Sequence, residues 1–113
     1  MKITKEFIED FLSSHKFSYE PNQNKLCFPK LERIFIRMFN DSYFRPIKIA
    51  NEKIIEGHHR YVCSEILTKK IEMIKGGINI SMETNYSWSA VIVEKNDWDS
   101  ESDLKLYEKE YDL

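Results

Sequence analysis

The strongest constraint on the fold of this chain is a change of hydrophobic period at Gly57. Upstream, residues 45–50 (RPIKIA) alternate between apolar and polar side chains, and residues 53–56 (KIIE) follow after a turn at Asn51 and Glu52. Downstream, the apolar residues recur at helical spacing, at Tyr61, Val62, Ile66 and Leu67. A β-hairpin that leads through a glycine into a helix predicts an α+β fold, with a small mixed β-sheet flanked by helices.

Three more helices are predicted from apolar stripes and helix-end signals. Thr4 is a suitable N-cap for a helix over residues 4–15. Pro29 suits the first turn of a second helix, whose apolar stripe is the most regular in the chain: Leu31, Ile34, Phe35, Met38 and Phe39. Ser100 and Asp103 form an S-x-x-D box ahead of a C-terminal helix. Further short strands are expected at residues 26–28, 71–74, 78–82 and 88–93.

Length and composition indicate one folded domain over residues 1–113, because single cores usually form at about 100 to 150 residues. With 42% hydrophobic and 13% aromatic residues, the chain has enough apolar surface to order a core.

The sequence contains no apolar run typical of a signal peptide or a membrane span. Its two cysteines, Cys27 and Cys63, form no C-x-x-C motif and are expected to be reduced and at least partly buried. We therefore expect a cytoplasmic protein with no membrane partner.

The net charge of −2 gives no general attraction to nucleic acid, which is therefore not an expected partner. The negative charge is concentrated at one end, since residues 96–113 hold 7 Asp and Glu against 2 Lys and Arg. Such a segment is usually a solvated helix face. It also fits a docking surface for a basic protein partner, which would make the chain a non-catalytic binding module such as an immunity or inhibitor protein.

The segment Gly57, His58, His59 and Arg60 is the best candidate site, because it links a buried strand to the start of a helix. Main-chain N–H groups there are unpaired and the helix dipole is positive, which suits a phosphate or carboxylate. Glycine allows close approach, arginine binds two phosphate oxygens, and neutral imidazoles donate hydrogen bonds. Glu56 could orient a nucleophile or bind a metal ion. The alternative is a structural role, since adjacent helical side chains point about 100° apart and often only one faces a cleft.

Two motifs in this region resemble the core of the ParB/sulfiredoxin superfamily. Residues 45–49 (RPIKI) are similar to its (Q/R)PI-x-V strand, and residues 55–61 (IEGHHRY) to its (D/E)GHHRY turn. The order of elements also agrees, and the resemblance covers roughly residues 29–70, over a third of the chain. It implies a small α+β domain that binds nucleotide phosphates. Members with similar motifs include CTP-binding partition proteins, the ATP-dependent reductase sulfiredoxin, free serine kinases and ParB-like nucleases.

The resemblance implies roles for individual residues. Gly57, His58, His59 and Arg60 would bind the phosphates of ATP or another nucleotide, and Arg45 would face the same cleft. Glu56 matches the acidic residue of the kinase-like members, as a base or a Mg²⁺ contact. The implied activity is Mg²⁺-dependent phosphoryl transfer or nucleotide hydrolysis, with Glu56, His58 and His59 as catalytic residues. A ParB-like nuclease is a further alternative.

The sequence also departs from this family. Sulfiredoxin has a reactive cysteine at the position of His58, so sulfinic acid reduction is not expected here. The arginines and the DNA-binding domain of the partition proteins are also missing from these 113 residues.

Other ligand sites have weaker support. The histidines and cysteines show no zinc-binding spacing. Glu32 is a second candidate contact for Mg²⁺, although a glutamate at such a position is more often a solvated helix residue. Four aromatic residues are candidates for stacking on a base: Phe44, Tyr86, Trp88 and Trp98. Trp88 is more typical of core packing, whereas Trp98 lies in an acidic segment and is expected to cap the fold or contact a partner.

Overall fold

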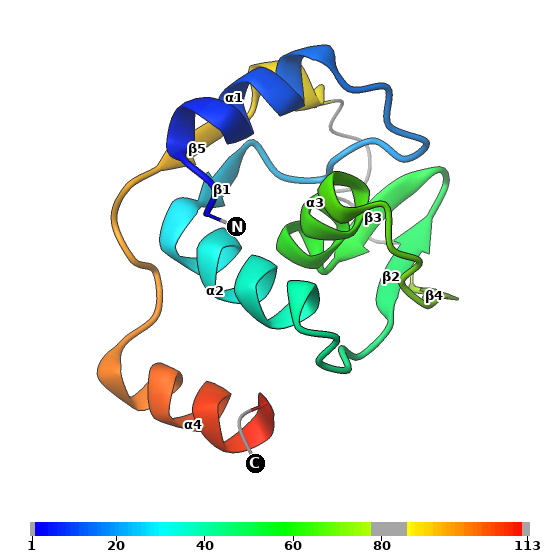
Figure 1. Ribbon diagram of the computed structural model, residues 1–113. Helices are drawn as coiled ribbons and strands as arrows, with labels where there is room; N and C mark the ends of the chain where they lie inside the picture. The colour runs from blue at the N-terminus through cyan, green and yellow to red at the C-terminus, as the bar shows by residue number, and fades with distance from the viewer. Residues whose placement is uncertain (1, 78–85, 112–113) are drawn as a thin grey trace.

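The computed structural model of the protein describes residues 2–77 and 86–111. Over this part of the chain it is a compact α+β fold (Figure 1). Its α-helices are α1 (Lys5–Ser14), α2 (Phe28–Phe39), α3 (His58–Leu67) and α4 (Glu101–Tyr111). The strands are β1 (Lys25–Cys27), β2 (Ile47–Ala50), β3 (Lys53–Glu56), β4 (Met73–Lys75) and β5 (Ile92–Glu94). A short 3₁₀ helix, η2 (Trp88–Ala90), precedes β5.

The described strands form two small sheets rather than the single mixed sheet expected from the sequence. In the three-stranded sheet, β2 lies in the centre, antiparallel to β3 and parallel to β4. β1 and β5 form a separate parallel pair, in which Leu26 lies opposite Val93. Helix α3 contacts both β1 and β2 and lies between them in Figure 1, so the two sheets remain apart.

The hydrophobic core lies between α2, α3 and the β2–β3 hairpin, and α1 covers one side of it. Helix α2 buries four residues of its predicted stripe, Leu31, Ile34, Phe35 and Met38, whereas Phe39 stays 46% exposed. Helix α3 contributes Tyr61, Val62 and Cys63, and the hairpin contributes Ile47 and Ile54. Among the described residues, no helix combines the length and the apolar character that crossing a bilayer requires.

Local signals in the sequence explain several element ends. The Oγ1 atom of Thr4 accepts a hydrogen bond from the N–H of Phe7 (3.1 Å), which confirms the predicted N-cap of α1. Ser100 and Asp103 form the predicted box, since each main-chain N–H donates to the side chain of the other residue. Asn51 and Glu52 both have positive φ (50° and 62°), as the tight turn of a two-residue hairpin requires.

Three strand predictions were wrong in their bounds, and a fourth lies outside the described residues. The strand expected at 26–28 is β1 (Lys25–Cys27), because Phe28 already begins α2 ahead of Pro29. The strand expected at 88–93 is instead η2 followed by β5. The cause is the buried indole of Trp88, whose Nε1–H donates to the carbonyl of Tyr19 (2.7 Å), while a tight turn places the N–H of Val91 on the carbonyl of Trp88 (3.2 Å). The strand expected at 71–74 begins later, at Met73. Residues 78–82, also expected to form a strand, are not among those described.

Candidate functional site

The turn at Gly57 is fixed by its backbone conformation and by close packing. Gly57 is the N-cap of α3 and has φ of 96°, a left-handed conformation that other residues adopt only with strain. A Cβ atom at this position would lie 2.5 Å from Cγ2 of Ile47 and 2.9 Å from Nη2 of Arg60. The chain can therefore leave β3 and enter α3 at this point only with glycine.

The two histidines that follow are buried and hold the start of α3 against the preceding chain. His58 is 4% exposed and His59 is 8% exposed. The main-chain N–H of Asn22 donates to Nε2 of His58 (2.9 Å), and that of Cys27 donates to Nε2 of His59 (2.9 Å). Each imidazole thus satisfies a donor that would otherwise be unpaired inside the protein. This arrangement gives both histidines a structural role that sequence reasoning offered only as an alternative.

Both imidazoles are neutral at physiological pH. Burial lowers the pKa of His58 to about 4. Burial, with smaller contributions from Lys30, His58 and Arg33, lowers the pKa of His59 to about 3. Because Nε2 accepts a hydrogen bond in each ring, the single proton lies on Nδ1. Proton transfer near pH 7 needs a pKa close to 7, so these values favour positioning and hydrogen-bond donation over acid–base catalysis by either histidine.

Arg60 lies beside the turn and contacts the chain that leads into β2. Its Nη1 donates to the carbonyl of Arg45 (2.6 Å) and, at 3.3 Å, to that of Pro46. The guanidinium also lies next to Gly57, as the close approach of Nη2 shows. The two motifs recognised in the sequence, RPI and GHHR, are thus joined by this side chain.

A pocket of about 440 Å³ opens at the start of α3. All six residues predicted for the site line it: Arg45, Glu56, Gly57, His58, His59 and Arg60. The pocket also has polar and aromatic walls that the sequence did not assign to the phosphate site: Gln23, Lys30, Trp98, Asp99 and Asp103. Lys30 was missed because it belongs to the first turn of α2, which no motif connects to the GHHR turn.

The carboxylates at the pocket do not form a metal site of their own. Glu56 is exposed and lies 3.2 Å from Nζ of Lys48, an ion pair that reaches across the hairpin. Glu32 lies on α2 but does not line the pocket. Within residues 2–77 and 86–111, no group of three or more histidine, cysteine or acidic side chains could hold a metal ion. A Mg²⁺ ion here would depend on oxygen atoms brought by a bound phosphate, with Glu56 as its candidate protein contact.

The four candidates for base stacking have different positions. Trp88 is buried in the core at 4% exposure, and Tyr86 does not line the pocket. Phe44 and Trp98 do line it. The ring of Trp98 meets the ring of His59 edge to face, with centroids 5.4 Å apart, and its Nε1–H donates to Glu94 (2.9 Å). Trp98 is 41% exposed against 7% for Phe44, so it is the more accessible of the two aromatic residues that line the pocket.

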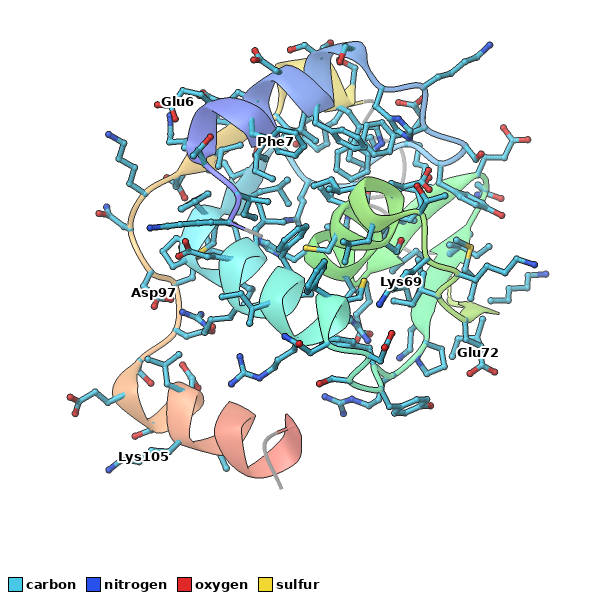
Figure 2. All side chains as sticks on the ribbon, viewed as in Figure 1. Glu6, Phe7, Lys69, Glu72, Asp97 and Lys105 are labelled. Carbon is cyan, nitrogen blue, oxygen red and sulfur yellow. The ribbon has the colours of Figure 1, made fainter. Side chains whose placement is uncertain are left out.

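The first residues of the acidic C-terminal segment pair with α2 at the edge of this pocket. Asp97 accepts two hydrogen bonds from Arg33, at 2.7 and 3.0 Å, and these hydrogen bonds are the main cause that lowers the pKa of Asp97. Asp99 also accepts from Arg33 and lies 3.5 Å from Nζ of Lys30. Figure 2 shows Asp97 on the connection between β5 and α4, and Lys105 on α4 directed away from the body.

Comparison of the chain with protein-family models, with curated proteins and with solved structures finds no match.

Proposed function

We propose that this protein is a phosphate-binding domain of the ParB/sulfiredoxin type, and that the pocket at the start of α3 takes the phosphates of a nucleotide or a similar small molecule. One observation carries the proposal. The GHHR turn, Arg45 and Lys30 all line one pocket. Its volume of about 440 Å³ is in the range of small-molecule sites, which usually measure about 300 to 1,000 Å³.

The chemistry of these groups suits an anion. The first N–H groups of α3 have no partner within the helix, and the positive end of the helix dipole adds to the attraction. Lys30 contributes a full positive charge and three donors. The neutral imidazoles of His58 and His59 add N–H donors at Nδ1 without the cost of a buried charge. Together these groups can replace the water molecules that surround a phosphate in solution.

Phosphoryl transfer or nucleotide hydrolysis is the reaction that we propose for the site, because such reactions depend mainly on positioning and charge neutralisation. Within this proposal His58 and His59 position the phosphates, and Glu56 is the residue to act as a base or as a contact for Mg²⁺. The metal would supply charge neutralisation on the phosphate oxygens when bound.

A cytoplasmic location also belongs to the proposal, because Cys27 and Cys63 are buried free thiols that fit a reducing compartment.

Two alternative functions have less support. Docking of a basic protein partner would use the acidic residues of 96–113, but Asp97 and Asp99 are already paired with Arg33 and Lys30 of the same chain. A nuclease would need to hold a polyanion, and the net charge of −2 opposes this at physiological salt.

Calorimetric titration with ATP, ADP and CTP, each with and without Mg²⁺, tests the proposal. We expect saturable binding of at least one nucleotide, and a Kd about tenfold higher for Lys30→Gln, because a charge-assisted hydrogen bond is worth about 1.5 kcal/mol or more. Lys16→Gln is the matched control, since Lys16 is exposed and does not line the pocket. Absence of heat with every nucleotide, or equal effects of the two substitutions, would contradict the proposal.

A further inference from the structure

We infer that the acidic segment over residues 97–103, here called the acidic strap, is an internal competitor for the phosphate pocket. In this inference the carboxylates of the strap neutralise the positive charge at the pocket while no ligand is bound. An anionic ligand must displace the strap to bind tightly. The inference rests on the proposed function, because it concerns the regulation of the same site.

The first support is the position of the strap's side chains. Trp98, Asp99 and Asp103 line the pocket together with Lys30 and the GHHR turn. The carboxylate of Asp99 lies 3.5 Å from Nζ of Lys30. A phosphate that used Lys30 would therefore compete with a carboxylate that the protein itself supplies, since one ammonium group cannot neutralise both fully.

The second support is the way in which the strap is held. Asp97 and Asp99 both pair with Arg33, which lies on α2 and does not line the pocket. Beyond the strap, α4 is largely exposed over its first turns, where Glu101, Ser102, Lys105 and Leu106 face solvent and only Leu104 is half-buried. The strap is thus attached near its start, through Arg33, Lys30, the indole of Trp98 and a hydrogen bond from the main-chain N–H of Trp98 to Sγ of Cys27 (3.4 Å). The pairing of Arg33 with Asp97 is bidentate and Asp99 is only half-buried, so this small network holds the strap more firmly than a single exposed ion pair would, and a bound anion must replace its interaction with Lys30.

Substitution of Arg33 gives a decisive test, because the two possible roles of this residue predict opposite changes in the affinity for an anion. If Arg33 acts only as a positive charge near the pocket, Arg33→Gln weakens the binding of an anion. If Arg33 holds a competing strap, the same substitution releases the strap and strengthens binding. A strap that is closed for about 90% of the time would reduce the apparent affinity about tenfold, so its release should lower Kd by about that factor.

The experiment measures the Kd of the full chain for ATP and for inorganic pyrophosphate at low ionic strength. We expect Kd to fall about five- to tenfold in Arg33→Gln and in Asp97→Asn, and to remain within twofold in Lys16→Gln, if the strap is closed most of the time. A Kd for Arg33→Gln equal to or higher than that of the unsubstituted protein overturns the inference and leaves the proposed function standing. Failure of every variant to bind either anion overturns both.

Acrylamide quenching of tryptophan fluorescence gives a second readout that needs no ligand. Trp98 is 41% exposed and Trp88 only 4%, so quenching reports mainly on the strap. We expect stronger quenching in Asp97→Asn than in the unsubstituted protein, at an unchanged melting temperature. This variant also serves if Arg33→Gln does not fold, and unchanged quenching in it overturns the inference.

Discussion

The Nε2 atom of His59 accepts a hydrogen bond from the main-chain N–H of Cys27 at 2.9 Å, which joins the start of α3 to the end of β1. The two residues are 32 positions apart in the sequence. Through this bond, the histidine fixes where α2 begins relative to the GHHR turn, because α2 follows Cys27 directly. It thereby sets the position of Lys30 at the pocket.

Substitution of His59 should destabilise the protein. We expect His59→Ala to lower the free energy of unfolding by about 2 to 4 kcal/mol, because it leaves the buried N–H of Cys27 unpaired and creates a cavity. Urea denaturation would measure this change. His15→Ala is the comparison, since His15 is only half-buried, and its effect should be smaller. Equal stability of His59→Ala and the unsubstituted protein would show that the hydrogen bond contributes nothing.

The buried histidines also predict how stability depends on pH. The pKa values of about 4 for His58 and about 3 for His59 lie below the value of 6.5 expected in the unfolded chain. The unfolded state therefore binds more protons between pH 6.5 and 3, so stability is full above pH 6.5 and falls as the pH falls toward these values. At most, the loss is about 3 kcal/mol for His58 and about 5 kcal/mol for His59.

Urea denaturation at pH 7, 6 and 5 would measure this dependence. In His58→Gln the slope of unfolding free energy against pH should be shallower than in the unsubstituted protein. A stability that stays constant from pH 7 to 5 would show that the imidazoles are not held neutral by burial.

Gly57 should tolerate no side chain. Gly57→Ala places a Cβ atom 2.5 Å from Cγ2 of Ile47 and keeps a strained positive φ, so we expect a loss of about 2 kcal/mol or more in unfolding free energy. Gly77→Ala is a matched control, because a Cβ there would meet no atom within 4 Å. Thermal denaturation of the two variants would compare them. Similar melting temperatures would contradict the close packing of the turn.

The thiols should be unreactive in the folded protein. Cys27 and Cys63 are both completely buried, and burial raises the pKa of the Cys63 thiol well above its usual value. We expect both thiols to react with Ellman's reagent only at the rate at which the protein opens, and to react at once in denaturant. Rapid labelling of Cys63 under native conditions would contradict the burial of α3 against α2.

The local pattern of apolar residues was sufficient to predict the secondary structure around the site. Both strands of the hairpin and the start of α3 follow from a change of hydrophobic period at a glycine, and the predicted range of β3 (Lys53–Glu56) agrees with the structure. The burial of Trp88 was also expected.

The composition of the pocket could not be predicted in the same way. Asp97 meets Arg33 across 64 positions, and the partnership of Asp99 with Lys30 is equally remote in sequence. The composition of an acidic segment does not show whether its carboxylates face solvent or pair with basic residues of the same protein. The split into two sheets was missed for a similar reason, because the pairing of β1 with β5 depends on contacts distant along the chain.

The most direct test of the central claim, that the pocket at the start of α3 binds phosphate, is a ¹H–¹⁵N NMR titration of the full chain with inorganic pyrophosphate. We predict that the largest chemical-shift changes occur at the amides of Gly57, His58, His59 and Arg60, together with Lys30. Saturation should give the same Kd at each of these amides. Changes confined to exposed lysines away from the pocket, such as Lys70 and Lys75, or no changes at all, would contradict the claim.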